Sequence, residues 1–287
     1  MPLRFLALGL MLAVGVVSGT FAQAQTAGAV ADADRRVVSL GNLLQMEQVI
    51  ELMREEGIEN ALALETEMFP GQGGPRWHAV ADQVYDPMAM RDIFDAAMLI
   101  ELSGDDAMLA EIEAFFASPL GVRVVGLEIA ARRALLDDAT EEAAKVALDD
   151  MMAAKEPRFG RLQAFAEVND LIESNVMGAL NANLAFYRGL AEVGDLDETL
   201  TEEQMLTEVW AQETDIRNET EEWLFPFLAL AYQPLSDADL EAYHDFSATG
   251  AGQKVNAALF LAFDAMFSKI SLDLGRAAAR QMQGQDL

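Results

Sequence analysis

Two stretches of the sequence share a pattern that is typical of a tight corner between two helices. The first, 112–123, reads Ile-Glu-Ala-Phe-Phe-Ala-Ser-Pro-Leu-Gly-Val-Arg. The second, 240–254, reads Leu-Glu-Ala-Tyr-His-Asp-Phe-Ser-Ala-Thr-Gly-Ala-Gly-Gln-Lys. We align 240–243 with 112–115 and Gly252 with Gly121, which leaves three extra residues in the second copy. This recurrence predicts an internal duplication.

The residue types explain why each stretch should form a corner. Ser118 is a good N-cap, and Pro119 suits the first helical position, where its missing N–H has no intrahelical partner to lose. Phe115 and Phe116 end the preceding helix, and Gly121 has no side chain to keep a ring from its backbone. In the second copy, the rings, the cap and the glycine are supplied by Tyr243, Phe246, Thr249 and Gly252, with Gly250 in place of the proline.

These residues resemble a family of bacterial periplasmic proteins grouped as domain of unknown function 2059. In that family a helix ends in Phe-Tyr or Tyr-x-x-Phe. A Ser/Thr-Pro or similar pair, a Gly, often a basic residue, and a long apolar helix follow. Residues 115–121 are similar to that signature and 243–254 form a looser copy, so the resemblance covers 95–138 and 222–270. It implies an all-helical secreted module with no assigned activity and no catalytic residues to carry over.

The N-terminus has the three parts of a secretory signal peptide. Arg4 provides a positive start, 5–17 are apolar, and Ala22-Gln23-Ala24 is an A-x-A cleavage site. We therefore expect cleavage after residue 24 and a periplasmic mature chain. An uncleaved membrane anchor is the alternative. No later segment has about 18 uninterrupted apolar residues, so no transmembrane span is expected in the mature chain.

Charge and cysteine content limit the classes of partner and chemistry. The formal net charge is -29, which argues against nucleic acid and anionic lipid as partners. The acidic residues are concentrated between 192 and 245, whereas basic residues occur in the helix after each corner. A solvated acidic face and a site for a cationic ligand are both open explanations. The absence of cysteine excludes disulfides and thiolate chemistry.

Apolar residues recur at three- and four-residue steps along most of the chain, and no alternating strand pattern is present. We predict an all-α helical bundle built from two pseudo-repeated halves. A helix from Ser39 is expected to end at Gly57 as a C-cap, with a second helix over 58–68. The expected organisation is a signal peptide (1–24), a flexible leader (25–38), a first repeat (39–138), a connecting helix (139–157) and a second repeat (158–283).

Few residues are candidates for chemistry. His78 and Asp82 share a helix face, but a third partner for them cannot be named, and His244 has no counterpart in the first corner. The best carboxylate set is an acidic strip at three- and four-residue steps, made of Glu208, Asp215, Glu219 and Glu222 with Gln212 among them. No metal-binding, phosphate-binding or dinucleotide-binding motif is present, so no metal and no cofactor are expected.

Two classes of function remain. The first is a non-enzymatic periplasmic module that offers a groove between the repeats to a peptide, an envelope protein or another copy of itself. The second is a metal-dependent or carboxylate-based hydrolase that uses the acidic helix 208–222. A tight cluster of Asp215, Glu219 and Glu222 with His78 or Arg217 would favour the enzyme, and an apolar groove would favour binding.

Overall fold

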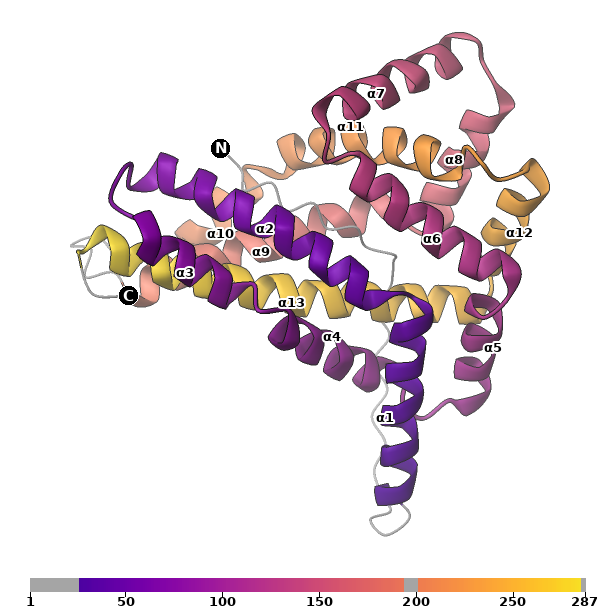
Figure 1. The fold of residues 1–287 in the computed structure, drawn as a ribbon, viewed down its shortest axis with the longest axis horizontal. Helices are drawn as coiled ribbons and strands as arrows, with labels where there is room; N and C mark the ends of the chain where they lie inside the picture. Colours follow the sequence, from indigo (N-terminus) through magenta and orange to yellow (C-terminus); the bar gives the residue numbers. More distant parts are fainter. Residues whose placement is uncertain (1–25, 194–200, 285–287) are drawn as a thin grey trace.

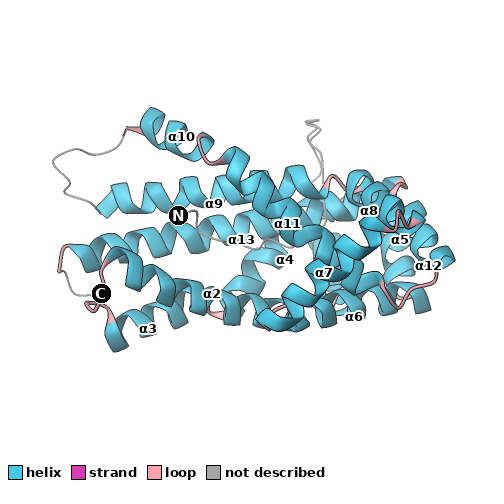
Figure 2. Cartoon of the chain, turned by 90° about the horizontal axis from the view of Figure 1, so that it is seen from above, coloured by secondary structure: helices cyan, strands magenta, loops and turns pink. Residues whose placement is uncertain are grey.

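The computed structural model of the chain describes residues 26–193 and 201–284, so the predicted signal peptide lies outside the described part. The described residues form helices and no strand, which confirms the all-α prediction (Figure 2). The helices are α1 (Thr26–Leu43), α2 (Met46–Met68), α3 (Gly74–Val84), α4 (Pro87–Leu102), α5 (Asp106–Phe116), α6 (Pro119–Ala134), α7 (Asp138–Ala153), α8 (Pro157–Val168), α9 (Leu171–Val193), α10 (Glu202–Trp210), α11 (Glu213–Tyr232), α12 (Asp237–Ser247) and α13 (Gly250–Met282).

The long helix α13 runs through the middle of the molecule, and α9 lies beside it (Figure 1). The two helices are parallel, as shown by pairs such as Asn181 with Asp264 and Glu192 with Arg276. Their backbones meet at Gly189 and Gly275: a Cβ atom added to Gly275 would lie 2.2 Å from the Phe186 carbonyl oxygen. Glycine at both positions therefore allows the two helix backbones to approach closely.

Helix α13 is also long and apolar enough to cross a membrane, judged by length and composition alone. The helices α5 and α6 would pass the same test together, although a 71° bend separates them. Within α13, 61% of the apolar window is buried inside the protein. The core helix of a folded domain has this property too.

The two predicted corners have nearly the same geometry. The Gly121 N–H donates to Ser118 Oγ and the Gly252 N–H donates to Thr249 Oγ1, both at 3.0 Å. A Cβ atom would lie 2.1 Å from the Phe115 oxygen at Gly121 and 2.0 Å from the Phe246 oxygen at Gly252. The helices that precede the corners, α5 and α12, have 11 residues each.

This geometry corrects our alignment of the corners. Phe246, not Tyr243, occupies the place of Phe115, because each lies six residues before the glycine that its carbonyl contacts. No extra residues are then needed in the second corner. The two equivalent rings, Phe115 and Phe246, stack on each other with centroids 3.7 Å apart and an interplanar angle of 1°. The corners thus face each other at one end of the molecule (Figure 1).

The helix that follows each corner packs against the other half of the chain. Helix α13 covers α4, with Phe94 and Phe263 in ring contact at 5.1 Å, and α6 covers α11. The first basic residue after each corner also pairs with the other half. Lys254 pairs with Glu101 at the end of α4, and Arg123 contacts Asp239 of α12. The halves therefore share their cores and do not form separate domains.

Two sequence-based expectations in the first half are wrong. Helix α2 continues through Gly57 to Met68, so Gly57 is not a C-cap. Its missing side chain instead makes room for the Tyr85 ring, because a Cβ atom there would lie 2.1 Å from Tyr85 Cε1. The backbone of the expected flexible leader is helical from Thr26 and belongs to α1.

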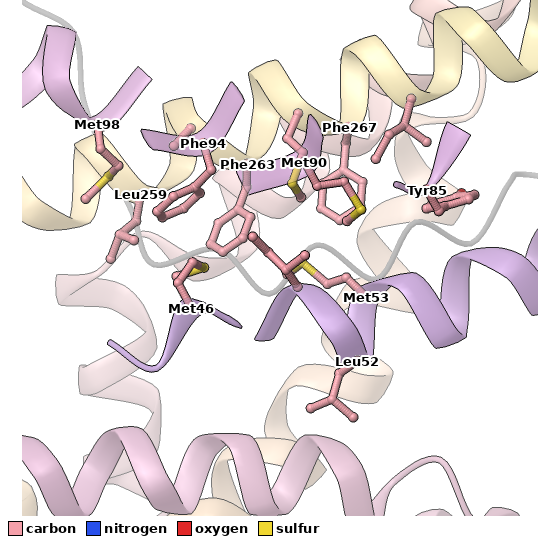
Figure 3. Packing of buried hydrophobic residues seen from close by; sticks show 14 of the residues in the cluster. Met46, Leu52, Met53, Tyr85, Met90, Phe94, Met98, Leu259, Phe263 and Phe267 are labelled. Atoms are coloured by element: carbon pink, nitrogen blue, oxygen red, sulfur yellow. The ribbon is translucent and has the colours of Figure 1, made fainter. Parts of the chain in front are cut away.

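The largest part of the core lies between α2, α4 and α13. In Figure 3, Met53 of α2 points toward the phenylalanines of α13, and Leu52 points to the other side of α2. Both side chains are nearly inaccessible to solvent. Helix α2 is therefore buried on two sides, and its second buried side faces the cavity described next.

Candidate ligand-binding cavity

A cavity of about 90 Å³ lies between the two predicted halves of the chain. The first half contributes residues from the start of α2, from the end of α5 and from α6, and the second half contributes α8, α9, α11, α12 and α13. Most of its wall is apolar, and seven aromatic side chains line it: Phe116, Phe165, Trp223, Phe227, Tyr232, Tyr243 and Phe263. An apolar cavity with a few polar groups is the usual form of a small-molecule site.

Glu128 of α6 is the carboxylate in this wall. Its Oε1 atom accepts hydrogen bonds from the Tyr232 hydroxyl at 2.7 Å and the Tyr243 hydroxyl at 3.2 Å. Because α6 packs against α11 and α12, a residue of the first half meets two residues of the second. The cluster of Glu128, Tyr232 and Tyr243 therefore joins the halves at the cavity.

The surroundings change the acidity of this cluster. Protein atoms surround Glu128, and it keeps only a small accessible surface where it lines the cavity. Burial raises the pKa of Glu128 to about 7, although the two tyrosine hydrogen bonds act in the opposite direction. Burial also raises the pKa of Tyr232 and Tyr243 well above the usual value, so both hydroxyls stay protonated. Glu128 can therefore exist as an acid or as a carboxylate near neutral pH.

Arg132, one turn after Glu128, is the cation of the cavity wall. It forms a two-pronged ion pair with Glu56 of α2, in which Arg132 Nε lies 3.0 Å from Glu56 Oε1 and Nη2 contacts Oε2. The two side chains are 7% and 12% exposed. Because this guanidinium is matched by its own carboxylate, it does not neutralise Glu128.

Asn175 of α9 is the amide side chain in the cavity wall, and it is only 4% exposed to solvent. Its Nδ2 atom donates to the Leu171 carbonyl oxygen at 2.7 Å. Its Oδ1 atom has no hydrogen-bond partner among the described residues. A buried acceptor without a donor costs free energy, so a hydrogen-bond donor brought by a ligand would be favourable here.

The predicted corner residues contribute directly to this site. Phe116 and Tyr243 line the cavity, and Phe115 stacks between Phe246 and Tyr243 behind it. The helix ends next to these rings are fixed by the cap and glycine residues of the corners, which are Ser118, Pro119, Gly121, Thr249 and Gly252. The corners were predicted as structural elements, and they also shape one wall of the cavity.

The acidic strip has a different location. Glu208 lies on α10, whereas Asp215, Glu219 and Glu222 lie on α11, and the helix is interrupted between Trp210 and Glu213. Glu222 pairs with Lys145, and Arg217 pairs with Glu173 and Glu213. Within residues 26–193 and 201–284, no group of three His, Cys, Asp or Glu side chains could hold a metal ion.

The two histidines do not join the cavity. His78 is exposed on α3, and Asp82, which shares its helix face, pairs with Arg54 at 2.7 Å. His244 lies beside Asp245, with Nδ1 3.5 Å from the carboxylate oxygen Oδ1. The described structure therefore does not bring either histidine together with the acidic strip into one site.

Sequence reasoning missed Glu128, Tyr232 and Asn175. One signal was present, since Glu128 is the single acidic residue in the apolar helix 119–134. A lone carboxylate on such a helix is unusual, because buried charge is unfavourable without a partner. Its partners come from α11 and α12, more than a hundred residues away, so the pattern alone could not identify them.

Comparison of the chain with protein-family models, with curated proteins and with solved structures finds no match.

Proposed function

We propose that this chain is a non-enzymatic binding module exported to the periplasm, and that the cavity around Glu128 is its binding site. The observation that carries the proposal is the cavity of about 90 Å³ between the two halves, with an apolar wall and few polar groups. Such a site recognises a small molecule by shape and by one or two hydrogen bonds. Periplasmic location is supported by the signal-peptide pattern of residues 1–24.

The cavity lies between the halves, where the sequence predicts a groove. Its size favours a small molecule over a peptide, an envelope protein or a second copy of the chain. An engineered cavity of about 150 Å³ holds a benzene molecule. The present cavity is smaller, so a ligand of a few carbon atoms suits it.

The two corners support two further parts of the proposal. These are a relationship to the domain of unknown function 2059 family and a duplication of the halves.

The test is binding of n-butanol, measured by isothermal titration calorimetry on the mature chain that begins at Gln25. We expect saturable binding. A Val125→Phe variant, which fills the cavity from α6, should lose it. A matched control is Val122→Phe, since Val122 is 51% exposed on the same helix.

Circular dichroism must show that both variants are folded. Equal binding of butanol by the wild type and a folded Val125→Phe variant would contradict the proposed site. Absence of saturable binding by the wild type would contradict the proposed function. Export is checked separately, by cell fractionation and by sequencing of the mature N-terminus.

A further inference from the structure

The polar groups of the cavity wall differ in how much hydrogen-bonding capacity they have left. The hydroxyls of Tyr232 and Tyr243 both donate to Glu128 Oε1, so these two donors are occupied. The guanidinium of Arg132 is directed to Glu56. The two tyrosine hydroxyls are therefore occupied within the protein, and the charge of Arg132 is matched by Glu56.

Two oxygen atoms of the wall can still accept hydrogen bonds. No described side chain donates to Glu128 Oε2, and Asn175 Oδ1 has no partner among the described residues. Asn175 is nearly inaccessible to bulk solvent, because it is 4% exposed. A ligand that completes this wall must therefore bring donors, and a ligand that brings only acceptors would leave these oxygens unsatisfied.

The negative charge of Glu128 favours a positively charged hydrogen-bond donor on the ligand over a neutral one. An ammonium group has three N–H donors and no acceptor, and it forms a charge-assisted hydrogen bond with a carboxylate. The cavity wall also contains Phe165, Trp223 and Phe227, and the face of an aromatic ring attracts cations. An anionic ligand would instead meet Glu128 while Arg132 is already matched by Glu56.

The charge of the whole chain acts in the same direction. The formal net charge is -29, which raises the concentration of small cations near the protein surface and lowers that of anions. The sequence left open whether the acidic residues serve a cationic ligand or only solvation. The cavity provides a place where such a ligand would be held.

We infer that the cavity binds a small alkyl amine in its ammonium form, with the ammonium group donating to Glu128 and the alkyl chain against the aromatic wall. This inference rests on the proposed function of the same cavity. It adds the chemical class of the ligand.

The experiment compares three compounds with the same n-butyl chain: n-butylammonium, n-butanol and butyrate. Calorimetry on the mature wild-type chain measures the dissociation constant of each, in a buffer without amines. We expect n-butylammonium to bind at least about tenfold more tightly than n-butanol, since a charge-assisted hydrogen bond is about twice as strong as a neutral one. Butyrate should bind more weakly than both.

Two variants assign this preference to the cavity. Glu128→Gln keeps the shape of the side chain and its acceptor for the tyrosines, but it removes the charge. It should reduce the affinity for n-butylammonium by about tenfold and leave n-butanol within about threefold. Glu111→Gln is the matched control, because Glu111 is exposed on α5, and it should change neither affinity.

The outcomes separate this inference from the function on which it rests. If n-butanol binds and n-butylammonium binds no more tightly, the amine class is wrong and the cavity remains a binding site. Retention of the amine preference in a folded Glu128→Gln variant would also overturn the inference. If n-butanol does not bind the wild type, the proposed function fails, and the inference fails with it.

Discussion

The titration of Glu128 should make the stability of this protein depend on pH in a specific way. Burial raises the pKa of Glu128 from 4.5 to about 7 in the folded chain. The difference corresponds to about 3 kcal/mol, at about 1.4 kcal/mol for each pKa unit. Because the folded state holds the proton more tightly than the unfolded chain, protonation of Glu128 stabilises the fold.

The direction of the effect follows from the two pKa values. The contribution of Glu128 is complete below about pH 4.5, decreases as the pH rises toward about 7, and is lost above that value. A Glu128→Gln variant has no proton to lose at this position. The unfolding free energy of the wild type minus that of the variant should therefore fall by about 2 to 3 kcal/mol between about pH 5 and about pH 8.

Urea denaturation followed by circular dichroism at both pH values measures this difference. The subtraction is needed because many other carboxylates titrate in the same chain, and their effect is common to both proteins. Glu111→Gln, at an exposed position of α5, should give a difference that does not change with pH. A pH-independent difference for Glu128→Gln would refute the account of a buried carboxyl with a raised pKa.

Further predictions concern the corners and the buried ion pair. Gly121→Ala and Gly252→Ala should each lower the unfolding free energy by about 2 kcal/mol, because the new Cβ would meet a backbone carbonyl oxygen at 2.1 or 2.0 Å. Gly126→Ala, in open space on the same helix as Gly121, should raise it by up to about 1 kcal/mol, and equal effects at Gly121 and Gly126 would contradict the corner geometry. Arg132→Leu should cost about 3 kcal/mol because it leaves the Glu56 carboxylate buried without its cation. The double variant with Glu56→Leu should recover much of that loss in the same denaturation assay, and a loss as large as that of the single variant would argue against this reason.

Local interactions allowed part of the fold to be predicted from the sequence. The N-caps Ser118 and Thr249 were identified correctly because each satisfies an N–H only three residues ahead. The all-α class followed from apolar spacing, since one buried stripe for each helix is enough to fix the period. Such signals lie within a few residues of each other, so no knowledge of the partner helices was needed.

Contacts between distant segments decided the rest. Gly57 has the composition of a helix end, yet α2 continues through it because Tyr85, from the end of α3, fills the space that a side chain would occupy. The register of the second corner became clear from the close approach of Gly252 to the Phe246 carbonyl, which matches that of Gly121 to the Phe115 carbonyl, and from the stacking of the two rings. Both Tyr243 and Phe246 fit the aromatic position of the corner pattern, and only the tertiary packing shows which of them is equivalent to Phe115.

The candidate site depended most on the tertiary structure. By itself, the sequence determined that the chain is helical, acidic and without cysteine, and it placed the helix ends at the corners. Only the packing of α6 against α11 and α12 brings Glu128 to Tyr232 and Tyr243. The physical reason is that the pKa of a carboxyl depends on the atoms that exclude water from it, and here those atoms come from helices far away in the sequence.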